Sequence, residues 1–383
     1  MDRIYLDNAA TSFPKAPGVK EAVCAFMENI GASPGRSTHA LSIKSGQILY
    51  QSRGLLADLL GLRDCKRVFF TYNATMAINT LLQGFLRPND IVVTTQMEHN
   101  ALMRPLHALQ KRLNLTILQI PCTPLCELDL ESARRLLKGA RLLACAHINN
   151  VSGAVIPLKE LSALARSEGV NFLLDGAQSV GCMEMYDVMQ KVDFLALSAH
   201  KGLLSPMGVG ALLIHDDFDM QTLEPLVFGG TGSASEEEIQ PIFLPDKFES
   251  GTPNMHGIAG LCAGIQWLKQ YGIAQIHTHE LALRNALVDG LKSLKNVKLY
   301  EAANPANATL SIDIKHKSIT EVGLRLDREF GIAVRVGLHC NPATHKILGS
   351  FAKGGSIRIS AGAFTTHTDI ESCIAAIHAI AQT

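Results

Sequence analysis

Two groups of polar residues in the middle of the chain each follow an apolar run, and their residue types could do amine and acid–base chemistry. The apolar runs at 170–174 and 192–197 show no polar–apolar alternation, which is typical of buried strands in a parallel sheet. In an open α/β sheet the carboxyl ends of the strands face the crevice where ligands bind, so we expect the two groups to converge. They are Asp175 and Gln178 after the first run, and Ser198, His200 and Lys201 after the second.

A carboxylate and a lysine placed together suit the chemistry of pyridoxal phosphate. The aldehyde of this cofactor forms a Schiff base with an amine, its ring nitrogen needs an acidic partner, and its phosphate needs several hydrogen-bond donors. The amine is supplied by Lys201 and the acidic partner by Asp175. The donors for the phosphate are supplied by Ser198 and His200. Each residue alone has an ordinary structural explanation, since Asp commonly caps a helix and Lys is usually exposed. The combination favours a cofactor site.

The segments Leu-Asp-Gly-Ala-Gln-Ser at 174–179 and Ser-Ala-His-Lys-Gly at 198–202 resemble the cofactor site of class V aminotransferase-fold enzymes. Within that group the chain is similar to the cysteine desulfurases and selenocysteine lyases, from Tyr5 to the C-terminal helix. The resemblance implies an α/β fold, the fold type I of pyridoxal-phosphate enzymes, with a mostly parallel seven-stranded sheet flanked by helices. It also implies a large cofactor-binding domain at 15–255 and a smaller α+β domain made of 1–14 and 256–383.

Composition and charge bear on the binding partners and the cellular location that the sequence predicts. Lys and Arg total 35, as do Asp and Glu, so nothing indicates nucleic acid or an anionic membrane surface as the main partner. No apolar run approaches the roughly 20 residues that span a bilayer, and the first residues lack the pattern of a signal peptide. Nine cysteines without a regular framework fit reduced thiols better than disulfides. We therefore expect a cytoplasmic protein.

Further cofactor contacts are predicted where other strands end. The strand at 68–71 leads through a short turn into a helix, and the amides at a helix start favour a phosphate. The resemblance assigns this phosphate role to Ala74 and Thr75, although relatives often carry a hydroxyl at the position of Ala74. It implies that His99, after the strand at 91–95, lies flat on the cofactor ring and moves protons. It also implies that Asn150 touches the phenolic oxygen of the cofactor or the carboxylate of the substrate.

Two loop segments are expected near a subunit interface. Arg36 and His39 lie in a loop rich in small residues, and the family places a similar segment near the active site and that interface. Thr252, in Phe-Glu-Ser-Gly-Thr-Pro-Asn, matches a threonine that reaches the phosphate of the neighbouring subunit. The resemblance therefore implies a homodimer with shared active sites. Between these loops, apolar spacing at 47–60 predicts an amphipathic helix ended by Gly61.

The C-terminal domain carries the residues expected to meet the substrate. Arg335-Val-Gly-Leu-His-Cys340 resembles the short Arg-x-Gly-x-His-Cys loop of one desulfurase subgroup, whose cysteine attacks the substrate sulfur. Cys340 follows a strand end, and His339 and Arg335 nearby could stabilise its thiolate. Arg358, inside an apolar strand, matches the arginine that binds the α-carboxylate through two parallel hydrogen bonds.

Metal binding is not predicted. Cys122 and Cys126 are closely spaced, and Cys145 with His147 follows, but no second closely spaced pair completes a tetrahedral zinc site.

The sequence predicts a pyridoxal-phosphate-dependent cysteine desulfurase that converts L-cysteine to L-alanine and holds the sulfur on Cys340 as a persulfide before a sulfur-acceptor protein takes it. Three alternatives stay open. The substrate could be selenocysteine, released without an obligatory persulfide. Cys340 could be incidental to another class V reaction on a small amino acid, such as transamination or sulfinate elimination. A sulfur-relay or scaffold protein with little catalysis is disfavoured, because it has no need of Lys201, Asp175, His99 and Arg358 together.

Overall fold

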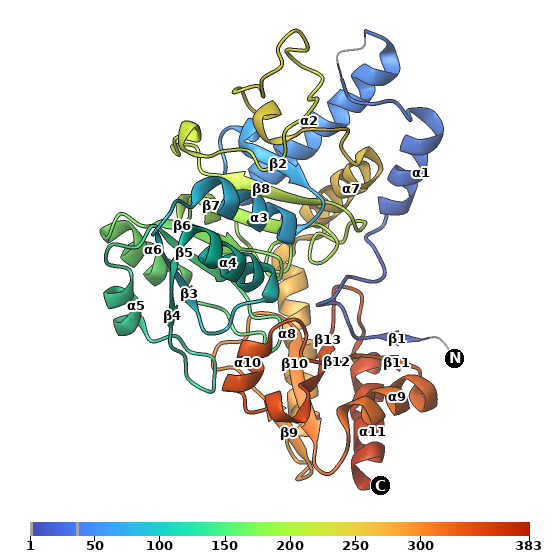
Figure 1. Cartoon of the computed structure of the whole chain (residues 1–383). Coiled ribbons are helices and arrows are strands. Elements are labelled where there is room, and N and C mark those ends of the chain that lie inside the picture. The colour runs from blue at the N-terminus through green and yellow to red at the C-terminus, as the bar shows by residue number, and fades with distance from the viewer. Residues whose placement is uncertain (1–2, 36–37) are drawn as a thin grey trace.

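A seven-stranded sheet forms the centre of the larger part of the molecule in the computed structural model, which describes residues 3–35 and 38–383 (Figure 1). The strand order is β2-β8-β7-β6-β5-β3-β4, and β8 alone runs antiparallel to its neighbours. The predicted mostly parallel sheet is therefore confirmed. Its strands are β2 (Val68–Thr71), β3 (Ile91–Thr95), β4 (Thr116–Ile120), β5 (Leu142–Ala146), β6 (Asn171–Asp175), β7 (Phe194–Ser198) and β8 (Gly210–Ile214).

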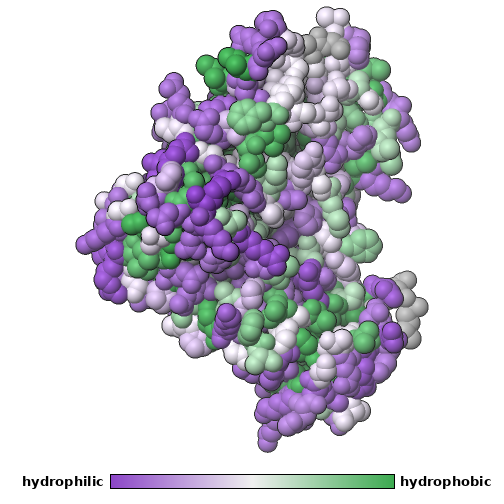
Figure 2. Space-filling view, viewed as in Figure 1, coloured by the Kyte–Doolittle hydropathy of each residue, from purple (hydrophilic) through white to green (hydrophobic). Residues whose placement is uncertain are grey.

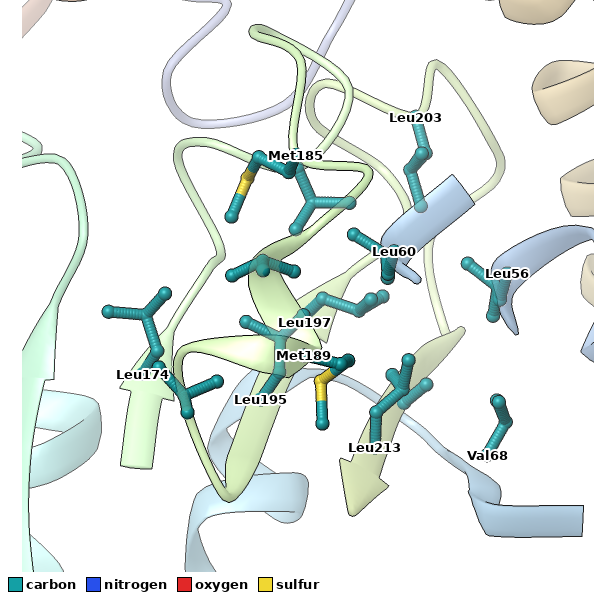
Figure 3. Packing of buried hydrophobic residues seen from close by; sticks show 14 of the residues in the cluster. Leu56, Leu60, Val68, Leu174, Met185, Met189, Leu195, Leu197, Leu203 and Leu213 are labelled. Atoms are coloured by element: carbon teal, nitrogen blue, oxygen red, sulfur yellow. The ribbon is translucent and has the colours of Figure 1, made fainter. Parts of the chain in front are cut away.

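Helices cover both faces of this sheet, which explains why its strands lack alternation. On one face Leu195, Leu197 and Leu213 pack against Leu56 and Leu60 (Figure 3). On the other face the alternate strand residues join a second apolar cluster with helices α3 and α4. The helices of this part are α1 (Val19–Asn29), α2 (Ala40–Leu60), α3 (Ala74–Phe85), α4 (Asn100–Leu113), α5 (Leu130–Leu136), α6 (Leu158–Ser167) and α7 (Met255–Tyr271).

A four-stranded antiparallel sheet, in the order β12-β13-β10-β9, forms the smaller part. The N-terminal strand β1 joins this part by pairing in parallel with β11. The molecule narrows between the two parts (Figure 2), and α8 extends from one to the other (Figure 1). The elements are β1 (Ile4–Tyr5), α8 (Ile273–Leu291), β9 (Val297–Tyr300), β10 (Thr309–Ile314), α9 (Ile319–Phe330), β11 (Ile332–Ala333), β12 (Arg335–Gly337), α10 (Pro342–Ile347), β13 (Ser356–Ser360) and α11 (His367–Gln382).

Helix α2 begins at Ala40, seven residues before the amphipathic pattern does. The ring Nδ1 of His39 accepts the amide of Ser42 at 3.2 Å and so caps the helix. Ser42 and Ser45 are buried in its first turns, so small polar residues occupy positions where the pattern predicts apolar ones.

All nine cysteines are free thiols, as the sequence predicts. Among the described residues, no helix combines the length and the hydropathy that crossing a membrane requires.

Candidate active site

The carboxyl ends of the central strands and the edge of the smaller sheet enclose a cavity of about 290 Å³. It brings together predicted residues that are far apart in the sequence. Those that line it are Ala74, Thr75, His99, Asn150, Asp175, Gln178, Ser198, His200, Lys201, Arg335, Cys340 and Arg358.

Lys201 and Asp175 line this cavity as residues of opposite charge; Asp175 is buried and Lys201 is half-buried. Asp175 is the last residue of β6, and Lys201 follows the end of the neighbouring strand β7. Burial lowers the pKa of Lys201 to about 8, although the Asp175 carboxylate opposes that shift. Burial raises the pKa of Asp175, while the amide of Ala177, at 2.9 Å from one carboxylate oxygen, lowers it. The amine is therefore largely protonated at pH 7 but can lose its proton without extreme alkalinity.

The start of α3 lies at the edge of the same cavity. The Ala74 amide donates to Ser198 Oγ at 2.9 Å, which ties the helix start to the end of β7. Gly210 makes this close approach possible, because a Cβ there would lie 2.6 Å from the Cα of Asn73. Thr75 is exposed in the first helical turn, where backbone amides have no partner within the helix.

His99 caps helix α4 and faces the same cavity. Its Nδ1 accepts the Ala101 amide at 3.0 Å, so the neutral ring carries its proton on Nε2. Burial and the charge of Lys201 lower the pKa of His99 to about 4. His99 is therefore neutral near pH 7 and presents an N–H donor.

Glu98 supports the turn that carries His99. The Oε1 atom of Glu98 accepts from Thr95 Oγ1 at 2.5 Å, and its Oε2 accepts from the Ala146 amide at 2.9 Å. The ladder between β3 and β5 ends at Val93, so this carboxyl links the two strands beyond their last pair. The sequence motif Glu-His-Asn draws attention to His99 and gives no indication of this link.

Two arginines face the cavity from neighbouring strands of the smaller sheet. Arg335 of β12 pairs directly with Arg358 of β13, an arrangement of like charges that is unfavourable by itself. Arg358 Nη2 donates to an Asp7 carboxylate oxygen at 2.7 Å, and its Nη1 donates to the Asn150 carbonyl at 3.1 Å. Its Nε is buried without a partner among the described residues.

Asp7 is a site residue that the sequence reasoning missed. It follows β1, and its carboxylate contacts a guanidinium 351 positions away in the chain. No local sequence pattern at Asp7 indicates this contact.

Cys340 opens into the cavity from the loop between β12 and α10, and the residue is exposed. His339 does not supply the positive charge expected beside its thiol. Burial and the nearby Arg358 lower the pKa of His339 to about 2, and its Nε2 lies 3.1 Å from Ser356 Oγ. That expectation was wrong because burial keeps the imidazole neutral. Arg335 and Arg358 are the cations in this corner of the cavity.

Three predicted residues do not line this cavity. Thr252 is exposed beside a separate hollow near Tyr72, and its segment is held by the buried ion pair between Glu249 and Arg53. His39 caps α2. Arg36 lies outside the described residues.

The residues of the cavity fit pyridoxal phosphate. Lys201 offers an amine, and Asp175 offers a buried carboxylate with one oxygen not bonded to any described donor. The corner at Ala74, Thr75 and Ser198 offers a helix start and hydroxyl groups for a phosphate. Gln178 donates to the Ala9 carbonyl at 2.9 Å, which ties the N-terminal turn to the cavity floor.

Comparisons with known proteins agree with this arrangement. The model of the class-V aminotransferase family matches residues 4–373. A probable cysteine desulfurase of Pyrococcus abyssi is 32% identical, and the match covers 99% of this chain and 94% of that protein. A second one, of Methanothermobacter thermautotrophicus, is 30% identical, with 97% and 92% covered. The apo structure of a cysteine desulfurase from Thermococcus onnurineus superposes with a TM-score of 0.93 at 31% identity, covering 100% of this chain and 95% of that one. The chain therefore belongs to the class-V aminotransferase family and groups within it with the cysteine desulfurases.

Proposed function

We propose that this protein is a pyridoxal-phosphate-dependent cysteine desulfurase, which converts L-cysteine to L-alanine and takes the sulfur onto Cys340 as a persulfide. One observation carries the proposal. An exposed thiol opens into the same cavity as a lysine, a buried carboxylate and two arginines. Cys340 would meet the substrate sulfur, Lys201 the Cα proton and the arginines the α-carboxylate, while Asp175 would serve the cofactor.

Different residues of the cavity would bind different parts of the cofactor. Asp175 would keep the ring nitrogen protonated, Lys201 would bind the aldehyde, and Ala74, Thr75 and Ser198 would hold the phosphate. When bound, the cofactor supplies an electron sink that stabilises negative charge at the substrate Cα. Lys201, with a pKa of about 8, is then a suitable base for the Cα proton.

Arg358 and Arg335 orient the substrate by its α-carboxylate. Arg335 and Arg358 pair directly, and Asp7 is the one carboxylate that forms an ion pair with either of them among the described residues, so the remaining positive charge favours an anion at this place. Asn150, whose carbonyl accepts from Arg358, would hold the same end of the substrate. A substrate bound through its α-carboxylate in this way would present its sulfur to Cys340.

Cys340 acts as the nucleophile. Its thiolate attacks the substrate sulfur, so an S–S bond forms as the bond between Cβ and sulfur breaks. The electron pair of the broken bond stays with the carbon skeleton. A proton added at Cβ and the return of a proton from Lys201 to Cα complete alanine. The persulfide is then open to attack by the thiol of an acceptor, which we expect to be a protein.

A second copy of the chain would complete the site. Thr252 lies on an exposed segment away from the cavity of its own chain. Large apolar side chains are exposed on and near the same segment, which fits burial against a second subunit. They are Tyr72, Val227, Phe228, Ile239 and Ile242. Nine free thiols also fit the reducing cytoplasm, where we place the protein.

The test is product formation from L-cysteine with dithiothreitol present. We expect the wild type and Cys24→Ser, a control at another exposed cysteine, to form sulfide and alanine in equal amounts. Lys201→Ala should form neither, and Cys340→Ser should be slower by about 100-fold or more. A wild type that holds the cofactor and makes neither product would overturn the substrate assignment, and full activity of Cys340→Ser would overturn the role of Cys340.

A further inference from the structure

The loop that carries Cys340 has an unusual backbone conformation. His339 and Cys340 have φ angles of 49° and 57°, so two successive non-glycine residues are left-handed. This conformation is disfavoured for residues with a Cβ, and it persists only where the surroundings hold it in place. The loop therefore needs contacts that outweigh its own preference.

Hydrogen bonds from the larger part of the molecule meet both of these residues. The Asn100 amide, at the start of α4, donates to the Cys340 carbonyl at 2.8 Å. The Asn150 side-chain amide donates to the His339 carbonyl at 2.7 Å. The loop is thus bonded to the segments that carry His99 and Asn150.

Asn341 joins these contacts into one buried network, with only 1% of its surface exposed. Its Nδ2 donates to the Met97 carbonyl at 2.8 Å and to Asn150 Oδ1 at 3.0 Å. Its Oδ1 accepts the Thr344 amide at 3.1 Å and so caps α10. One side chain therefore bonds to the turn before His99, to Asn150, and to the helix that follows Cys340.

We propose that Asn341 is a positioning residue that keeps the Cys340 sulfur in line with the substrate by holding the 339–340 backbone left-handed. The inference rests on the proposed nucleophilic role of Cys340. Without the two Nδ2 donors, the loop is free to relax to negative φ, which changes the direction of the Cys340 side chain. The thiol then stays exposed and reactive but is misplaced for attack.

Asn341→Asp separates this role from helix capping. Aspartate keeps the oxygen that caps α10, but it loses both donors and faces the Met97 carbonyl with a carboxylate. Asn341→Ser also keeps a capping oxygen, and it introduces no charge. Asn114→Asp is the matched control, because Asn114 Nδ2 donates to Asn89 Oδ1 at 2.8 Å on the exposed surface.

Three measurements on the cofactor-loaded dimer test the proposal. We expect kcat for L-cysteine to fall about 10- to 100-fold in both Asn341 variants, with KM changed less than about 3-fold, because misplacement of a reacting group by about 1 Å has effects of this size. Alkylation of Cys340 by iodoacetamide should stay within about 3-fold of the wild-type rate. Hydrogen exchange of the 97–104 segment should accelerate, because the Asn100 amide loses its acceptor. Asn114→Asp should match the wild type in all three.

The outcomes separate this inference from the proposed function. Wild-type kcat or wild-type exchange in both Asn341 variants overturns the positioning role. The positioning role is also overturned if kcat falls by the same factor in the Asn341 variants and in Asn114→Asp. If Cys340→Ser keeps full activity, the proposed function fails instead, and the exchange data still report whether Asn341 holds the loop. If Asn341→Asp does not fold, Asn341→Ser decides the question.

Discussion

Lys201 is the residue whose protonation most directly controls the proposed chemistry. Burial lowers its pKa to about 8, and the Asp175 carboxylate opposes that shift. We predict that in the apoenzyme the reductive methylation of Lys201 rises with pH around an apparent pKa of about 8. Mass spectrometry of the Lys201 peptide measures this, with the exposed Lys20 as internal reference. Asp175→Asn should move the titration to lower pH, and a shift to higher pH would contradict the pairing of the two residues.

Arg358 carries a prediction about substrate affinity. Lysine cannot reproduce the two parallel hydrogen bonds of a guanidinium to a carboxylate. Arg358→Lys should raise KM for L-cysteine by about 10- to 100-fold, which corresponds to the loss of one hydrogen bond to a charged group. Steady-state kinetics at saturating cofactor measure it. Arg63→Lys, at an exposed ion pair far from the cavity, should leave KM unchanged.

Among the individual site residues, the sequence predicted those that lie in recognisable motifs. Asp175 and Ser198 end the strands β6 and β7, and Lys201 follows β7, so a local pattern predicted them. Asp7, Glu98 and Asn341 were missed, because their roles depend on contacts between distant segments. The contact of Asp7 with Arg358 joins positions 351 apart, and no local pattern records such a pair.

The Glu98 carboxyl, which links the ends of β3 and β5, is favoured in its protonated form by burial. Burial raises the pKa of Glu98 to about 8, well above its value of about 4.3 in an unfolded chain. The native state therefore holds a proton that the unfolded state releases between these values. This group's contribution to stability is full below about pH 4 and falls as pH rises towards 8, by about 3–5 kcal/mol.

Glu98→Gln tests that dependence. Glutamine keeps an acceptor for the Ala146 amide and has no proton to lose. We predict that the free energy of unfolding of this variant falls less steeply between pH 5 and 8 than that of the wild type, in urea titrations of the apoprotein. Glu371→Gln, at an exposed position, is the control. If the free energy of unfolding depends on pH equally in Glu98→Gln and in the wild type, the Glu98 carboxyl is ionised in the folded protein.

Elements were predictable where hydrophobic spacing alone defines them. The strands β6 and β7 were expected because their apolar runs have no alternation, and both lie in the sheet between two apolar clusters. The start of α2 was not predictable in this way. Buried serines and a histidine cap occupy its first turns, so its hydrophobic pattern begins only after several residues.

The proposed homodimer with shared active sites predicts a particular behaviour of mixed dimers. If Thr252 serves the neighbouring subunit, Lys201→Ala and Thr252→Ala subunits complement each other. One site of the mixed dimer then has both defects and the other has none. Thr252→Ala alone should weaken cofactor affinity by about 10-fold, as expected for loss of one hydrogen bond to a phosphate.

The measurement is desulfurase activity after the two variants are unfolded together and refolded, at limiting cofactor. Shared sites predict a specific activity well above the mean of the two parent dimers. Activity equal to that mean would place Thr252 in the site of its own chain. Separately refolded and then mixed parents are the control.

The transfer of sulfur to Cys340 is the central claim, and one turnover tests it most directly. Cofactor-loaded enzyme is mixed with an equimolar amount of L-cysteine in the absence of reductant, quenched with an alkylating agent, and digested for mass spectrometry. The account predicts one additional sulfur atom on the Cys340 peptide, close to one per active site, and none on the peptide of the exposed Cys24. Alanine formed in equal amount while Cys340 stays unmodified, or sulfur found on another cysteine, would contradict it.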